Sequence, residues 1–332
     1  MKPVSRWSLI GLSCSLAAQA CSGQRVTTVS GNTAADHVAI ATRAAGEEYR
    51  AVLDLCAPLE PPSTEPVAES SLVPPPVPPR ADWYVPPVRV FDNLYFVGER
   101  EYSAWAITTS NGIILVDTLW PYSVHDEIVD GLRTVGLDPA AIKYAIVTHA
   151  HIDHAGGAKY LQDELGVPIL MSAPEWETLA HDRGRWPKPA PDRVVADGER
   201  LTLGDTTVTI YVTPGHTPGT LSLLVPVRDG GHPHLAAEWG GTGFNFTLSQ
   251  DKPQSYWLGI YSRSAERFRA IAVDAGADVL ISNHTSFDGS TRKLGDLSRR
   301  RPGDAHPYVV GVASVSNFLT VVDECAQAAL HH

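Results

Sequence analysis

The sequence is poor in positive charge, in cysteine and in long apolar runs, and these shortages exclude several classes of protein. Lys and Arg number 26 against 37 Asp and Glu, a formal net charge of −11, and no basic run offsets that balance. Such a surface repels a phosphate backbone, so we expect no nucleic-acid partner. Beyond the N-terminus no apolar segment is long enough to cross a bilayer, so we expect no membrane span.

The N-terminus has the features of a signal peptide. Two basic residues precede an apolar stretch, and Ala18-Gln19-Ala20 has the small-x-small form of a signal-peptidase site. We predict that residues 1–20 are removed and that the protein is periplasmic. Cys21 follows at once, so a lipid anchor is the alternative, although Ala18 stands where a lipoprotein signal has a bulky apolar residue.

Two of the cysteines that would remain after this cleavage lie far apart in the chain. Cys56 and Cys325 each stand at the end of a helical-looking segment, and neither is near a candidate metal ligand. Because an oxidising compartment permits disulfides, we hypothesise a bridge between them that clamps the chain ends.

Composition divides the rest of the chain into an N-terminal helix and proline-rich strap, 21–87, and a larger domain, 88–330. Residues 33–55 have apolar side chains at helical spacing, and residues 58–87 are rich in proline, which favours an extended connector. The 332 residues are enough to bury a large core.

From residue 88 onward, short strand patterns alternate with helical ones. This order predicts an α/β layered fold in which two sheets meet, with histidine loops at their shared edge. The predicted strands are 91–97, 102–109, 112–118, 142–148, 167–171, 201–203, 207–212, 220–225 and 279–282, and the predicted helices are 123–135, 155–165, 174–181, 255–275 and 307–330.

A cluster of histidines directly follows the predicted strand 142–148. His149, His151, Asp153 and His154 lie within six residues. Imidazole is a common metal ligand, and a nearby carboxylate suits zinc or iron. A histidine-rich surface loop is the structural alternative. The spacing favours a metal site.

Two further histidines have a similar context. His216 lies in a turn rich in proline and glycine between two strands, and His284 comes just after the strand 279–282. Together with the first cluster they give five histidines and one aspartate. That set can bind two metal ions with three protein ligands each, which leaves open positions of the kind that catalysis requires.

These motifs resemble the metallo-β-lactamase superfamily. The resemblance runs from about residue 83 to 289 and rests on His149-x-His151-x-Asp153-His154 and on Thr213-Pro214-Gly215-His216-Thr217-Pro218-Gly219. It implies an αββα sandwich with the metals at the edge of the two sheets. It also implies two Zn2+ ions, of which the first would be held by His149, His151 and His216, and the second by Asp153, His154 and His284.

The ligand set resembles class B β-lactamases of subclass 3 in particular. Subclass 1 places a cysteine in the second site, and no cysteine here has a suitable position. Lactonase and glyoxalase relatives usually bridge both metals with an aspartate, but the corresponding stretch, 235–242, has none; Glu238 is a rival candidate there. By the same resemblance, Asp117 would support the site from behind the ligands.

The resemblance predicts hydrolysis of an amide or ester in a ring of a small-molecule substrate. Two zinc ions would lower the pKa of a shared water from about 15.7 toward roughly 7, and the zinc-bound hydroxide would attack the carbonyl carbon. Asp153 would be catalytic, by orienting the nucleophile and accepting its proton. Trp239, Thr242 and Asn245, in a glycine-rich turn, are candidates for substrate binding, or else belong to a turn with one core aromatic residue.

Three functions therefore stay open on the sequence alone. The first is an exported zinc β-lactamase, and the second is a superfamily hydrolase that acts on a lactone, thioester or other ester. The third is a binding protein or a di-iron redox protein, since the ligands alone do not select the metal.

Overall fold

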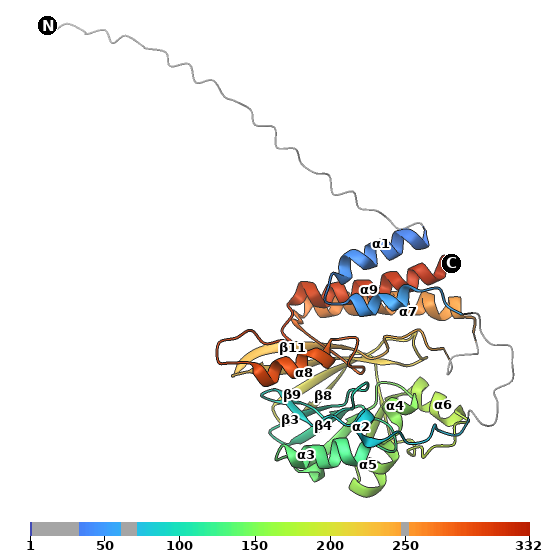
Figure 1. The fold of residues 1–332 in the computed structure, drawn as a ribbon, viewed down its shortest axis with the longest axis vertical. Coiled ribbons are helices and arrows are strands. Elements are labelled where there is room, and N and C mark those ends of the chain that lie inside the picture. The colour runs from blue at the N-terminus through green and yellow to red at the C-terminus, as the bar shows by residue number, and fades with distance from the viewer. Residues whose placement is uncertain (2–32, 61–71, 247–251) are drawn as a thin grey trace. The chain divides into compact units, whose positions relative to one another are not determined.

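The computed structural model describes residues 1, 33–60, 72–246 and 252–332. The predicted signal peptide and Cys21 lie outside the described residues. The chain divides into two units, Met1–Ser30 and Gly31–His332, and the coloured elements of Figure 1 belong to the second unit.

Seven of the described strands form the first sheet, in the order β1-β2-β3-β4-β5-β6-β7. Neighbours from β1 to β4 are antiparallel, and neighbours from β4 to β7 are parallel. The strands are β1 (Val88–Phe91), β2 (Leu94–Phe96), β3 (Trp105–Thr109), β4 (Gly112–Val116), β5 (Ile142–Ile146), β6 (Ile169–Ser172) and β7 (Arg193–Val195).

Five further strands form the second sheet, in the order β12-β11-β10-β9-β8. The pairs from β8 to β11 are antiparallel, and β11 pairs with β12 in parallel. The strands are β8 (Glu199–Leu203), β9 (Thr206–Val212), β10 (Leu221–Asp229), β11 (His232–Trp239) and β12 (Val279–Ser282).

The two sheets pack face to face, and strand alternation separates an inner core from two outer cores. In β4, Ile114 and Val116 point into the core between the sheets, whereas Ile113 and Leu115 point to helices on the outer face. Those helices lie on one side of the sandwich in Figure 1. They are η3 (Val124–Val129, a π-helical turn), α3 (Asp130–Thr134), α4 (Ile152–Ala155), α5 (Ala158–Leu165) and α6 (Ala173–His181).

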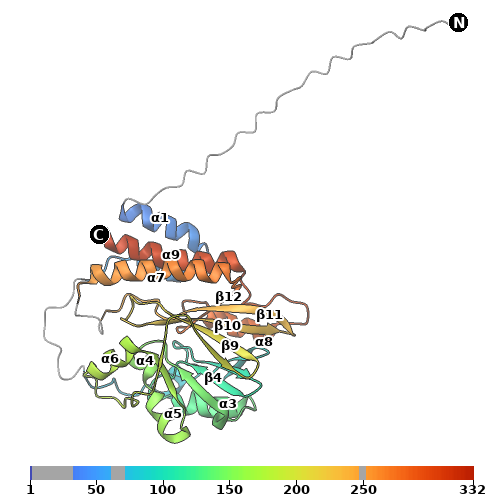
Figure 2. The same ribbon diagram turned by 180° about the vertical axis from the view of Figure 1, so that it is seen from behind.

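The opposite face is covered by helices from both ends of the chain. Figure 2 shows α1 (Ala34–Ala45) beside α9 (Val312–Leu330), with α7 (Gln254–Asp274) between them and the second sheet. Trp239, Phe268 and Phe318 belong to this outer core. The predicted αββα sandwich is confirmed. None of the described helices is both long and apolar enough to cross a bilayer.

A disulfide fixes the N-terminal segment to this layer. Cys56, at the end of the 3-10 helix η1 (Arg50–Cys56), is bonded to Cys325 in α9, 269 positions later. The predicted pairing is confirmed.

The N-terminal segment differs from the predicted single helix over 33–55. The α-helix ends at Ala45, because Gly46 takes a positive φ of 52°, and the chain resumes as the separate helix η1. The proline-rich strap contains one unpredicted helical turn, α2 (Arg80–Trp83), directly before β1. The helix α8 (Ser290–Arg299), which precedes α9 in the chain, contacts β1.

Candidate metal centre

The candidate ligands converge because several strands end at the same edge of the sandwich. The histidine loop follows β5, and α4 begins at Ile152 within it. His216 lies between β9 and β10, and His284 follows β12. The turn with His216 is packed tightly, since a Cβ added at Gly241 would lie 2.5 Å from Cβ of His216. Only glycine fits there without displacing the ligand.

Three imidazole nitrogens meet in the first cluster. Nε2 of His216 lies 3.1 Å from Nε2 of His149 and 3.1 Å from Nδ1 of His151. Two nitrogens bound to one tetrahedral zinc at about 2.0–2.1 Å would lie roughly 3.3–3.4 Å apart. The spacing therefore fits a shared ion.

A carboxylate and two imidazoles meet in the second cluster. Nε2 of His154 lies 3.1 Å from Nε2 of His284 and 3.2 Å from Oδ2 of Asp153. The same carboxylate oxygen lies 3.6 Å from Nε2 of His284. Within each cluster the donor atoms lie within 4.8 Å of one another. The six predicted ligands thus form the two predicted groups of three.

Hydrogen bonds behind the ligands hold the imidazole rings in place. The Nδ1 atom of His154 lies 2.9 Å from Oδ2 of Asp117, that of His149 lies 3.0 Å from Oγ1 of Thr148, and that of His216 lies 2.5 Å from the Gly243 carbonyl oxygen. A proton on each Nδ1 leaves the Nε2 lone pair directed at the cluster. Asp117, with φ 58°, also accepts from the Thr148 backbone N–H.

Burial keeps most of these histidines neutral, as metal ligation requires. Burial lowers the pKa of His151 and His284 to about 3 and that of His216 to about 4, and it holds the pKa of His149 well below its usual value. His154 differs. Burial opposes its charge, but Asp153 and Asp117 raise its pKa to about 10.

The carboxylates of Asp153 and Asp117 therefore favour a positive charge at the position of His154. Burial opposes ionisation of Asp153, but the neighbouring His154 and His284 hold its pKa well below the usual range. A bound cation can take the place of the imidazolium proton. The donor set of five imidazoles and one carboxylate suits zinc.

Glu175, which sequence reasoning missed, links the two loops that carry the first cluster. Its Oε2 accepts from the Ala150 N–H and its Oε1 from the Gly219 N–H, both at 2.7 Å. Burial raises its pKa to about 7, against these hydrogen bonds and one from Thr217. The sequence Ser172-x-x-Glu175 signals only a helix cap, and Ser172 does cap α6.

Replacement of Glu175 by glutamine is expected to weaken metal binding 10- to 100-fold, the usual cost of losing a group that orients ligands. The amide retains one acceptor but places an NH2 against the second backbone N–H. Competition with a chromophoric zinc chelator measures the effect, and Glu177→Gln, at an exposed position of α6, is the matched control. Equal zinc affinity in both variants would contradict this role.

The predicted substrate-binding residues occupy different environments. Trp239 is 1% exposed, and its indole N–H donates to the Tyr261 hydroxyl on α7, away from the metal clusters. The Thr242 side chain is also buried, whereas Asn245 is exposed. A substrate contact by any of these three residues stays a prediction. Of the three, Asn245 alone is exposed and could contact a substrate without rearrangement of the core.

Glu238, the rival metal contact, belongs to neither cluster of three. It is fully buried between the sheets, and both carboxylate oxygens lack a hydrogen-bond partner among the described residues. Burial, with Asp117 next in effect, raises its pKa well above the ordinary value. Glu238 is therefore a buried acid that folding favours in its neutral form.

Glu238→Gln is expected to stabilise the metal-free protein at neutral and alkaline pH. Because the folded-state pKa of Glu238 is raised, the wild-type protein tolerates this side chain best below the unfolded-state pKa of about 4.3. The unfolding free energy of the wild type then falls as the pH rises above that value, by up to about 1.4 kcal/mol per pH unit. Urea unfolding of both proteins at pH 5 and pH 8, with EDTA, measures this. The variant's advantage should grow with pH, and an advantage equal at both pH values would contradict the assignment.

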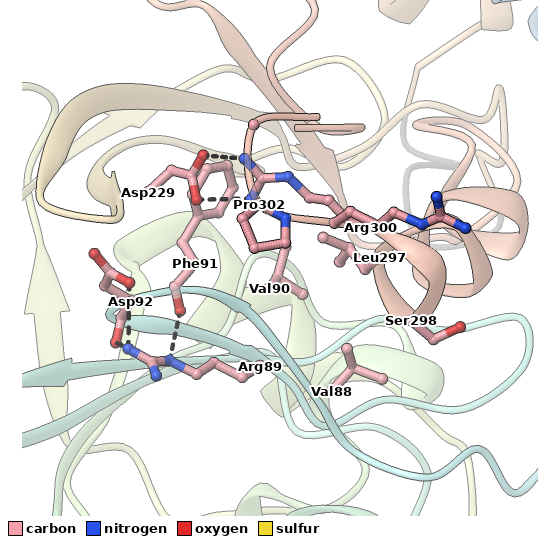
Figure 3. A pocket seen from close by; sticks show the side chains of 12 residues that line it. Val88, Arg89, Val90, Phe91, Asp92, Asp229, Leu297, Ser298, Arg300 and Pro302 are labelled. Carbon is pink, nitrogen blue, oxygen red and sulfur yellow. Dashed lines mark hydrogen bonds and ion pairs between the residues drawn. The ribbon is translucent and has the colours of Figure 1, made fainter. Parts of the chain in front are cut away.

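A separate cavity of about 580 Å³ lies between β1 and the end of α8 (Figure 3). Two of its arginines are engaged: Arg300 forms two hydrogen bonds with Asp229, and Arg89 contacts Asp92. Asp229 ends β10, whereas the loop with His216 precedes that strand of nine residues. The cavity is therefore remote from the metal centre.

Comparison with known proteins agrees with the fold. The family model of the metallo-β-lactamase superfamily matches residues 97–256 of this chain. The structure is similar to BJP-1, a subclass B3 metallo-β-lactamase of Bradyrhizobium japonicum, with a TM-score of 0.60 and 28% identity over 70% of this chain and 89% of that one. The FEZ-1 metallo-β-lactamase of Legionella gormanii shares the fold, with a TM-score of 0.62 and 24% identity over 71% and 91%.

Sequence relatives also include a lactonase. An N-acyl homoserine lactonase of a Bacillus species is 29% identical over 167 residues, which are 43% of this chain and 65% of that one. The match thus spans less than two thirds of the lactonase.

Proposed function

This chain belongs to the metallo-β-lactamase superfamily and is one of its metallo-hydrolases, and from that premise we propose that it is a zinc β-lactamase. In this proposal His149, His151 and His216 hold one zinc ion, and Asp153, His154 and His284 hold a second. The observation that carries the proposal is the grouping of these six donors at distances that suit two ions.

When bound, zinc supplies Lewis-acid polarisation of the carbonyl and lowers the pKa of the attacking water. The chain's own residues would orient the attacking water, accept its proton and hold the ligand side chains in place. Oδ2 of Asp153 faces the second cluster, so it would orient the water and accept its proton. Asp117, Thr148 and the Gly243 carbonyl keep the imidazole rings oriented while this occurs.

Two features favour a β-lactam over another ring. Among the described residues, no carboxylate belongs to both clusters, since Glu238 lies outside each of them, whereas the bridging aspartate expected of a lactonase would belong to both. The similarity to BJP-1 covers most of that enzyme. The similarity to N-acyl homoserine lactonases supports the alternative, a hydrolase of lactones or other esters.

A hydrolysis panel on the zinc-loaded protein tests the proposal. We expect turnover of a carbapenem and a penicillin, and weaker turnover of N-acyl homoserine lactones. Turnover of lactones without either β-lactam would overturn the β-lactamase assignment and favour the alternative. The predicted export after residue 20 belongs to the same proposal, and N-terminal sequencing of periplasmic protein tests it.

A further inference from the structure

A chain of aromatic rings lies beside the second metal cluster. Tyr102 and Trp120 have ring centroids 5.9 Å apart, and Trp120 is stacked on Tyr122 at 5.8 Å with an interplanar angle of 20°. All three rings are half-buried. We call these three residues the aromatic wall.

The wall adjoins two ligands directly. The Tyr102 ring lies 5.1 Å from that of His284 and 6.4 Å from that of His154, in both cases edge to face. An isolated β-bridge also joins the backbones of Tyr102 and His284. A substrate held at the second cluster would therefore meet the wall with whatever group it carries on that side.

Buried contacts hold the wall in position. The Tyr122 hydroxyl and the Ser123 hydroxyl both donate to the carboxylate of Glu99, which is 1% exposed. The Glu99 backbone N–H donates to the Tyr102 carbonyl oxygen at 2.7 Å, and Trp83 packs behind Tyr122 at 5.4 Å. A surface that is already ordered binds a ligand with little loss of conformational entropy.

The rings of the wall carry no charge. Burial, and after it the carboxylates of Asp153, Glu101 and Glu99, raises the pKa of the Tyr102 hydroxyl, so that hydroxyl stays protonated. A neutral flat group can therefore stack on Tyr102 and Trp120. Aromatic pairs of this kind prefer offset or edge-to-face contact and add to the gain from apolar burial.

We propose that the aromatic wall binds a neutral aryl group that the substrate carries next to its scissile carbonyl. This inference rests on the proposed function, because it takes the substrate to be a ring amide or ester bound at the metal clusters. It makes Trp120 and Tyr102 specificity-determining residues.

Two pairs of probes test the wall, each pair differing only in an aryl group. Benzylpenicillin is compared with N-acetyl-6-aminopenicillanic acid, and N-phenylacetyl homoserine lactone with N-acetyl homoserine lactone. Kd on the zinc-loaded protein is measured by calorimetry, and KM and kcat wherever turnover occurs. We expect the aryl member of a pair to bind roughly 3- to 10-fold more tightly.

Trp120→Ala should reduce the affinity advantage of the aryl probe over its partner to about twofold or less, mainly through Kd and KM. Trp120→Phe should restore most of that advantage. Trp120→Leu gives the same comparison if the alanine variant does not fold. Tyr160→Ala is the matched control, because the Tyr160 ring contacts His125 and none of the six ligands. Zinc content and melting temperature of each variant identify changes that are only structural.

The two proposals fail in different ways. An aryl preference in Kd without hydrolysis of either penicillin contradicts the β-lactamase assignment and leaves the wall supported. Hydrolysis of both penicillins with no aryl preference, or with a preference that Trp120→Ala leaves intact, overturns the wall. Loss of the preference in Tyr160→Ala as well would also overturn it.

Discussion

Replacing His151 or Asp153 with alanine is expected to remove bound metal and hydrolytic activity together. Each residue supplies one of the three donors in its cluster, and their donor atoms face neighbouring ligand atoms at 3.1 and 3.2 Å. Loss of metal returns the attacking water toward its ordinary pKa, so activity should fall by at least about 10³-fold.

Zinc content by elemental analysis and kcat/KM on the same samples measure this effect. His181→Ala is the control, because His181 is an exposed histidine at the end of α6 that contacts only a backbone carbonyl there. A His151→Ala variant that lost its zinc yet kept wild-type activity would refute the metal-dependent reaction. Loss of activity in the control would show that histidine removal acts through the fold.

Removing the Cys56–Cys325 disulfide is expected to cost about 5 kcal/mol of unfolding free energy. The bond closes a loop over a sequence separation of 269 residues, and the chain-entropy account gives larger stabilisation for longer loops. Both cysteines lie in the outer core with α1, α7 and α9, so the bond also keeps the N-terminal helices on the second sheet.

Urea unfolding of the Cys56→Ser/Cys325→Ser double variant measures the loss, with wild type in a reducing agent as the matched comparison. Both samples should unfold at a lower urea concentration than oxidised wild type, and by similar amounts. An unchanged midpoint would contradict the stabilising role. Metal content should be retained under native conditions, since neither cysteine belongs to a ligand cluster.

The two groups of candidate metal ligands could be predicted from the sequence because their signals are local. His149, His151, Asp153 and His154 are close in the chain, and His216 and His284 each follow or precede a strand pattern. Strand ends that meet at one edge then bring the two groups together. The disulfide could be predicted for a similar reason, since few cysteines were available to pair.

Other residues near the site, unlike Asp117, could not be placed from the sequence, because their roles depend on contacts between distant segments. Glu175 has the sequence pattern of a helix cap, yet its carboxylate bonds the loops of Ala150 and Gly219. Trp239 directly precedes a glycine-rich stretch, yet it ends strand β11, where strand alternation directs its ring to α7 rather than to the metal edge. Such roles require the pairing of the strands to be known.

The central claim is that six residues hold two zinc ions. Anomalous diffraction at the zinc edge, from crystals of the zinc-loaded protein, tests it most directly. We predict two peaks about 3.5–4 Å apart, one bounded by His149, His151 and His216 and the other by Asp153, His154 and His284. A single peak, or a second peak outside these residues, would contradict the account.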